Sequence, residues 1–185
     1  MPDALEGKFA DLEQRLLDRH IHIGRGIGVP FLLLLYPPSE ERRVRRETST
    51  LMAKLRAAGR AVEVVDCNQV LLDTLIQSNE LERAIRAERR NPEGLRDFGI
   101  GEALAGALVE RVKAASQGVG DGGVVFLTRL GALHPFLLPS VLQERLAGES
   151  LRAPIVFLVP AGEENGGDYL FLGVEQTRRY RGTYL

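Results

Sequence analysis

The carboxylate and thiol that follow an expected strand, Asp66 and Cys67, are the first side chains in this sequence that suggest chemistry. A reactive thiolate needs a neighbouring histidine or a helix N-terminus to lower its pKa. His134 also follows an expected strand and is the candidate partner. A lone cysteine is more commonly a small buried residue, and an aspartate before a helix commonly caps it. We therefore interpret Cys67 as structural and Asp66 as a helix N-cap, and predict no catalytic residue.

Two histidines spaced as His20-x-His22 would project to the same side of an extended segment, as metal ligands can. A third ligand would come from Asp18, Asp66 or His134, and the spacing does not indicate that these converge. We interpret the pair as partly exposed residues beside a loop and predict no metal site.

A glycine-rich segment, Gly24-x-Gly26-x-Gly28, raises the question of phosphate binding. It precedes an expected strand, whereas a nucleotide-binding loop joins a strand to the helix that follows it. The turn after that strand is Pro37-Pro38-Ser39, and proline has no N–H to donate to a phosphate. We therefore predict a flexible connector and no bound nucleotide or other cofactor.

An apolar run, Val124–Leu127, ends in Thr128-Arg129 and then in the turn Gly131-Ala132-Leu133-His134-Pro135-Phe136. This pattern is typical of a buried parallel strand, and α/β folds usually place their function at the carboxyl ends of such strands. The turn carries no acid, nucleophile or phosphate-binding glycine run. The candidate residues at this edge of the sheet are Asp66, Thr128, Arg129 and His134.

Two groups of basic residues are candidates for contact with a partner or a nucleic acid. The first is a strip in a helical stretch, partly offset by Glu82 and Glu88, and the second is a tail whose tyrosine could stack on a base. The residues are Arg83, Arg86, Arg89 and Arg90 in the strip, and Arg178, Arg179, Tyr180 and Arg181 in the tail. Another cluster, Arg42–Arg46, is flanked by glutamates and is interpreted as a solvated helix face.

Strands that alternate with helices must position these residues. Apolar periodicity predicts a helix over residues 4–19, a helix beginning after Ser39 as N-cap and ending near Gly59, and a helical stretch over 70–90 that Ser78-Asn79 interrupts. Further helices are expected over 101–116 and 139–146. Expected strands are 30–36, 61–65, 124–127, 154–159 and 169–172, the last two forming a hairpin. The prediction is an α/β fold with three layers and a mostly parallel sheet of about five strands, similar to a P-loop NTPase or Rossmann fold without a phosphate-binding loop.

Composition agrees with one globular domain over residues 1–185, in which 1–28 form a helix and flexible lead-in and 174–185 a basic tail. The net charge of −1 argues against a bulk nucleic-acid binder. The longest apolar run, Val29–Tyr36, is too short to cross a membrane, and no secretory signal is recognised. The chain has 1 cysteine, which fits a reducing compartment, so we expect a cytoplasmic protein without membrane contact.

Several segments together resemble the BrxB family, a small component of the BREX bacteriophage-exclusion systems. The resemblance spans about residues 10–185, and its segments are Val29–Phe31, Tyr36–Pro38, Phe126–Phe136, Ile155–Pro160, Leu170–Gly173 and Arg179–Leu185. The chain departs from the family pattern at Arg129, where glycine is common, and at Val159–Gly167, where Tyr-Pro-Gly-x-Tyr-Asp-Gly is expected.

The resemblance implies a role in antiviral defence beside a methyltransferase, a large ATPase and a PglZ-type protein of the alkaline-phosphatase class. It supplies no catalytic residues. We expect a non-catalytic adaptor that engages other BREX components through protein–protein interaction, above all the PglZ-type protein. Two alternatives stay open: a subunit that contacts DNA through the basic residues, and a nucleotide-binding or hydrolytic protein with an unrecognised site.

Overall fold

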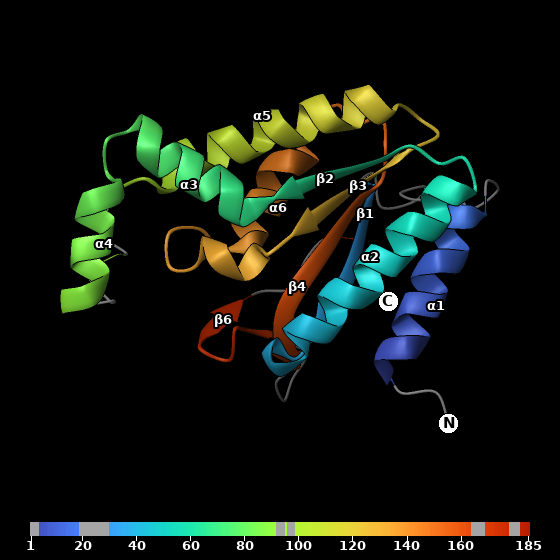
Figure 1. Ribbon diagram of the computed structural model, residues 1–185, viewed down its shortest axis with the longest axis horizontal. Helices are drawn as coiled ribbons and strands as arrows, with labels where there is room; N and C mark the ends of the chain where they lie inside the picture. Colours follow the sequence, from blue (N-terminus) through green and yellow to red (C-terminus); the bar gives the residue numbers. More distant parts are fainter. Residues whose placement is uncertain (1–3, 19–29, 92–94, 96–98, 164–168, 178–181) are drawn as a thin grey trace.

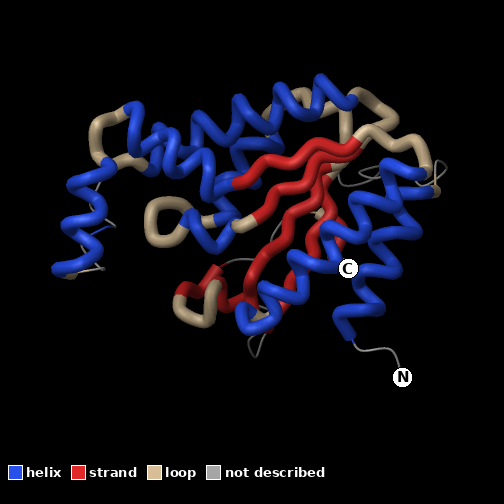
Figure 2. Tube along the Cα trace, viewed as in Figure 1, coloured by secondary structure: helices blue, strands red, loops and turns tan. Residues whose placement is uncertain are grey.

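The computed structural model of the chain describes residues 4–18, 30–91, 95, 99–163, 169–177 and 182–185. Helices cover both faces of a central twisted sheet, which gives the three-layer α/β fold that the sequence predicted (Figure 1). Strands run through the middle of the molecule, and the helices lie outside them (Figure 2). No helix of these residues is both long enough and apolar enough to cross a membrane.

The central strands are parallel and lie in the order β2-β3-β4-β1-β7. Their bounds are Phe31–Tyr36 for β1, Val62–Asp66 for β2, Val124–Thr128 for β3, Ile155–Glu163 for β4 and Thr183–Tyr184 for β7. The end of β4 pairs with β5 (Tyr169–Phe171) as an antiparallel hairpin, which confirms that expectation, and β5 pairs with β6 (Glu175–Thr177).

All six residues of β1 are buried, because both faces of the sheet are covered. Side chains alternate between the faces of a strand. Phe31, Leu33 and Leu35 therefore belong to one hydrophobic core, and Leu32, Leu34 and Tyr36 belong to the other.

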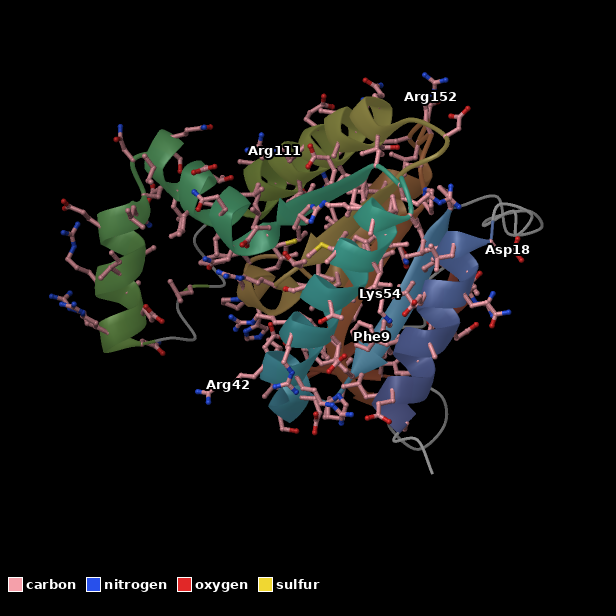
Figure 3. All side chains as sticks on the ribbon, turned by 45° about the vertical axis from the view of Figure 1, so that its right-hand side comes forward. Phe9, Asp18, Arg42, Lys54, Arg111 and Arg152 are labelled. Atoms are coloured by element: carbon pink, nitrogen blue, oxygen red, sulfur yellow. The ribbon has the colours of Figure 1, made fainter. Side chains whose placement is uncertain are left out.

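Helices α1 (Ala4–Leu17) and α2 (Glu41–Ala57) cover the face of Leu32 and Leu34. Figure 3 shows the two helices side by side, and Lys54 of α2 pairs with Glu13 of α1 at 2.7 Å. The expected N-cap at Ser39 is wrong. A short 3-10 turn, η1 (Pro38–Glu40), contains Ser39, so α2 begins after Glu40 without a side-chain cap.

The other face is covered by α3 (Cys67–Gln77), α5 (Gly101–Val119), α6 (Pro139–Ala147) and the 3-10 turn η3 (Leu130–Leu133). The predicted interruption at Ser78-Asn79 is confirmed: α3 ends there, and α4 (Leu81–Arg90) begins as a separate helix. Asn79 adopts a left-handed backbone with φ of 57°, which breaks the helix. Helix α4 projects beyond the end of the sheet (Figure 1).

The C-terminal segment, expected as a basic tail, contains two strands that sequence reasoning missed, β6 and β7. Residues 182–185 lie against β1: Leu32 and Leu33 pair with Thr183 and Tyr184, and Leu185 donates its N–H to the Leu33 carbonyl at 3.1 Å. The ring of Tyr184 stacks on Tyr169 with 5.6 Å between the centroids. These strands have only three and two residues and no apolar alternation, so the sequence does not distinguish them from a loop.

We predict that Gly182→Ala destabilises the fold. Gly182 has a φ of 140°, and an added Cβ would lie 2.8 Å from the carbonyl oxygen of Phe31. Strain of this kind costs about 1–3 kcal/mol. Urea unfolding followed by circular dichroism measures the loss. Gly162→Ala is the control, because nothing lies within 4 Å of the Cβ it would add; equal effects of the two substitutions would contradict the prediction.

Candidate functional site

The carboxyl ends of β1, β2 and β3 meet at one edge of the sheet, where open α/β sheets place their ligand sites. Asp66 and Thr128 end their strands as a register pair. A cavity of about 180 Å³, called here the edge pocket, lies between α2 and these strand ends. Its lining residues are Tyr36, Glu41, Val44, Arg45, Thr48, Ser49, Met52, Val64, Asp66, Thr128, Arg129 and Leu158.

Asp66 has two roles at this edge. Its Oδ1 accepts the backbone N–H groups of Asn68 at 3.0 Å and Gln69 at 3.3 Å, which confirms the predicted N-cap and starts α3 earlier than the expected residue 70. Its Oδ2 lies 3.4 Å from Nε of Arg129. The structure therefore brings together Asp66, Thr128 and Arg129 of the four candidate edge residues.

His134, the fourth candidate, lies elsewhere. Its Nε2 is 3.8 Å from Oε2 of Glu175 in β6, and its ring centroid is 6.5 Å from that of Phe171. It lines a separate, wider cavity of about 480 Å³ with Gly101, Glu102 and Glu175. The 3-10 turn η3 lies between Arg129 and His134, so these two residues are close in sequence but line different cavities.

A chain of polar contacts on the α2 side of the edge pocket was missed by sequence reasoning. Tyr36 donates its hydroxyl to Oε2 of Glu41, and Nε of Arg45 donates to Oε1 of Glu41 at 3.0 Å. Burial, and then the hydrogen bond to the Glu41 carboxylate, raises the pKa of Tyr36, so it stays protonated and donates. The available signal was a hydroxyl at the end of an otherwise apolar strand, five residues before a helix carboxylate.

Thr48 of α2 also lines the edge pocket, and it was not among the candidate residues of the sequence. The residue is 2% exposed, and its Oγ1 has no hydrogen-bond partner among the described residues. Thr74 of α3, also buried, instead donates to the Val70 carbonyl at 2.8 Å. Thr48 thus lines the pocket while its hydroxyl oxygen is itself buried and, among the described residues, unpaired.

Cys67 is fully buried in the core, as predicted. Burial, with a smaller contribution from the neighbouring Asp66 carboxylate, raises the pKa of its thiol. The thiolate that nucleophilic catalysis requires is therefore disfavoured.

Several of the other candidate residues lie outside the part of the chain that the structure describes. His20, His22 and the glycines at 24, 26 and 28 lie outside the described residues, as do Arg178–Arg181. Within the described part of the chain, no group of three or more His, Cys, Asp or Glu residues could hold a metal ion.

The basic strip lies on α4 and is exposed. Arg83 contacts both carboxylate oxygens of Glu80, at 3.0 and 3.1 Å, and Arg86 lies 3.3 Å from Glu82. Arg89 and Arg90 occupy the last turn, where positive charge complements the helix dipole. Half of the strip is thus paired with acids of its own segment.

The sheet order, the two helical layers and the pocket at the carboxyl edge define an open α/β protein with a polar strand-end site. The chain belongs to the BrxB family: the family model for BREX protein BrxB matches residues 63–185, more than half of its length. It is therefore a component of a BREX antiphage system. Searches of curated proteins and of solved structures returned no match.

We predict that stability declines in alkaline solution. Cys67 and Tyr36 have pKa values raised above the ordinary 9.0 and 10.0, so the unfolded chain loses these protons first. Their stabilisation is complete below about pH 9 and is lost as the pH rises, by up to about 1.4 kcal/mol per pH unit for each group. Urea unfolding between about pH 8 and about pH 10.5 measures the slope. Cys67→Ala and Tyr36→Phe should each make the loss of stability with rising pH less steep. Unchanged slopes in both variants would show that these two groups do not cause the alkaline loss.

We also predict that Thr48→Val stabilises the isolated protein by about 1 kcal/mol, because it replaces an unsatisfied buried hydroxyl with a methyl of similar size. Helix propensity changes little between these two residues. Thermal and urea unfolding measure the effect. Thr74→Val is the matched control, since it removes a formed hydrogen bond and should give no gain. A loss of stability in Thr48→Val would contradict the prediction.

Proposed function

We propose that this chain is a non-catalytic adaptor of its BREX system and that it docks onto the PglZ-type component through α4. The observation that carries the docking surface is the position of α4, which extends past the sheet as an exposed amphipathic helix (Figure 1). Membership of a multicomponent defence system supplies the context in which such a helix would be covered.

The adaptor role is supported by what the reactive groups at the sheet edge do. The Asp66 carboxylate caps α3 and pairs with Arg129, and the Glu41 carboxylate accepts from Tyr36 and Arg45. General acid–base catalysis needs a titratable group whose pKa suits proton transfer and whose geometry leaves it accessible. These carboxylates instead hold local structure together.

Helix α4 combines an apolar anchor with a charged rim. Ile85 is 41% exposed on this helix, and Ile76, near the end of α3, is 57% exposed. Ala84 is buried, while Leu81 and Ala87 pack partly against the core, so one side of α4 is held and the other is open. Ile85 has Arg89 one turn further along the same helix, and an exposed apolar residue beside an arginine is a common composition for a protein interface.

The charge on α4 favours a protein partner over DNA. Four arginines stand beside Glu80, Glu82 and Glu88, and Arg83 and Arg86 are already paired with acids. A phosphate backbone is bound by unpaired cations that release counterions, which this helix offers mainly at Arg89 and Arg90. We therefore favour an acidic protein surface over DNA as the partner of α4.

The test is co-purification of the tagged full chain with each BREX component in turn. We expect retention of the PglZ-type protein, with about a tenfold or greater loss for Ile85→Glu and for Arg89→Glu combined with Arg90→Glu, as for interface residues that contribute strongly to binding. Helix α4 is exposed at these positions, so the fold should persist; circular dichroism checks this.

Two controls match these changes. Val174→Glu alters another exposed apolar side chain, 65% exposed in the β5–β6 turn, and Arg152→Glu alters an arginine at the opposite end of the molecule (Figure 3). Both should retain the partner. Capture of no component, or equal losses in the controls, would overturn the proposal, and a salt-sensitive shift of duplex DNA lost in the α4 variants would favour the nucleic-acid role instead.

A further inference from the structure

The edge pocket contains hydrogen-bond donors that the fold leaves unused. Arg45 uses its Nε toward Glu41, and Arg129 uses its Nε toward Asp66. Among the described residues, no hydrogen-bond partner is found for the terminal guanidinium nitrogens of either arginine or for the hydroxyl of Thr48. The carboxylates of Glu41 and Asp66, by contrast, are each engaged by two or more donors.

The same two arginines also line a second cavity of about 340 Å³. This second cavity shares Glu41, Arg45 and Arg129 with the edge pocket and extends over the ends of β1 and β4. Its remaining lining residues are Pro38, Asn68, Gly131, Ala132, Pro160 and Leu172. A ligand group between the arginines can therefore extend into either cavity.

Part of the lining of the edge pocket is apolar. Val44, Met52 and Leu158 line it, together with Val64 of the edge strand β2, which is 37% exposed. Ligand pockets typically join such apolar walls to a few convergent polar groups that fix orientation. Guanidinium groups in this arrangement match planar carboxylates and phosphates, to which arginine donates two parallel hydrogen bonds.

We propose that the carboxyl edge binds a small organic anion, whose carboxylate or phosphate is held by Arg45 and Arg129 and whose compact apolar part lies against Val44, Met52 and Leu158. This inference is independent of partner docking, because α4 contributes no residue to the pocket. It assigns a use to the donors that the fold leaves unpaired.

The experiment is isothermal titration calorimetry on the full chain with three probes: phenyl phosphate, benzoate and inorganic phosphate. The first two distinguish a phosphate from a carboxylate as the anionic group, and the third lacks an apolar part. We expect one organic probe to bind, and inorganic phosphate to bind about tenfold more weakly or not at all, because the apolar wall contributes.

Arg45→Gln and Arg129→Gly should each weaken binding about tenfold or more, the loss expected for one hydrogen bond to a charged group. Arg129→Gly suits its left-handed backbone, with φ of 57°, so the fold is not strained. Arg42→Gln is the matched control: Arg42 lies on the same helix as Arg45, lines neither cavity and extends into solvent (Figure 3).

Three results would overturn the inference. The first is that neither organic probe binds the wild-type chain. The second is that binding persists unchanged in both Arg45→Gln and Arg129→Gly, or falls equally in Arg42→Gln. The third is that inorganic phosphate binds as tightly as the organic probes, which would leave the apolar wall without a role.

Discussion

The double burial of β1 is the constraint on which the rest of this structure depends. Its six residues lie between β4 and the short C-terminal strand β7, and each side chain enters one of two cores. A strand that is apolar at every position is stable only when both faces of the sheet are covered, because each exposed side chain of this size would cost about 1.5–3 kcal/mol. The helical layers of α1 and α2 on one face and of α3, α5 and α6 on the other meet this requirement.

The same arrangement brings polar groups to one edge of the sheet. Parallel strands end together, so Tyr36, Asp66 and Thr128 gather where apolar packing stops and the chain turns into helices. Most of these groups serve the fold: Asp66 starts α3, and Glu41 joins Tyr36 to Arg45. What remains is a set of guanidinium donors on Arg45 and Arg129, on which the proposed anion site rests.

Helix α4, which we propose as the docking surface, and the edge pocket differ in how they relate to the family match. The matched segment, residues 63–185, contains α4 and the β2 and β3 side of the pocket. Tyr36, Glu41, Arg45 and Thr48 come from β1 and α2, which precede it. Helix α4 thus lies entirely within the matched segment. The proposed anion site takes part of its lining from that segment and the rest from β1 and α2, which precede it.

Local patterns in the sequence were sufficient for the layers, the main strands, the break at Ser78-Asn79 and the cap at Asp66, because apolar periodicity, helix breaking and capping depend on neighbours in the chain. They failed at Ser39, where a 3-10 turn intervenes, and at β6 and β7, which exist only because longer elements pair with them. The separation of His134 from Arg129, and the convergence of Arg45 with Arg129, were also beyond sequence reasoning. Residues far apart in the chain meet according to strand order and helix packing, and no spacing in the sequence encodes that geometry directly.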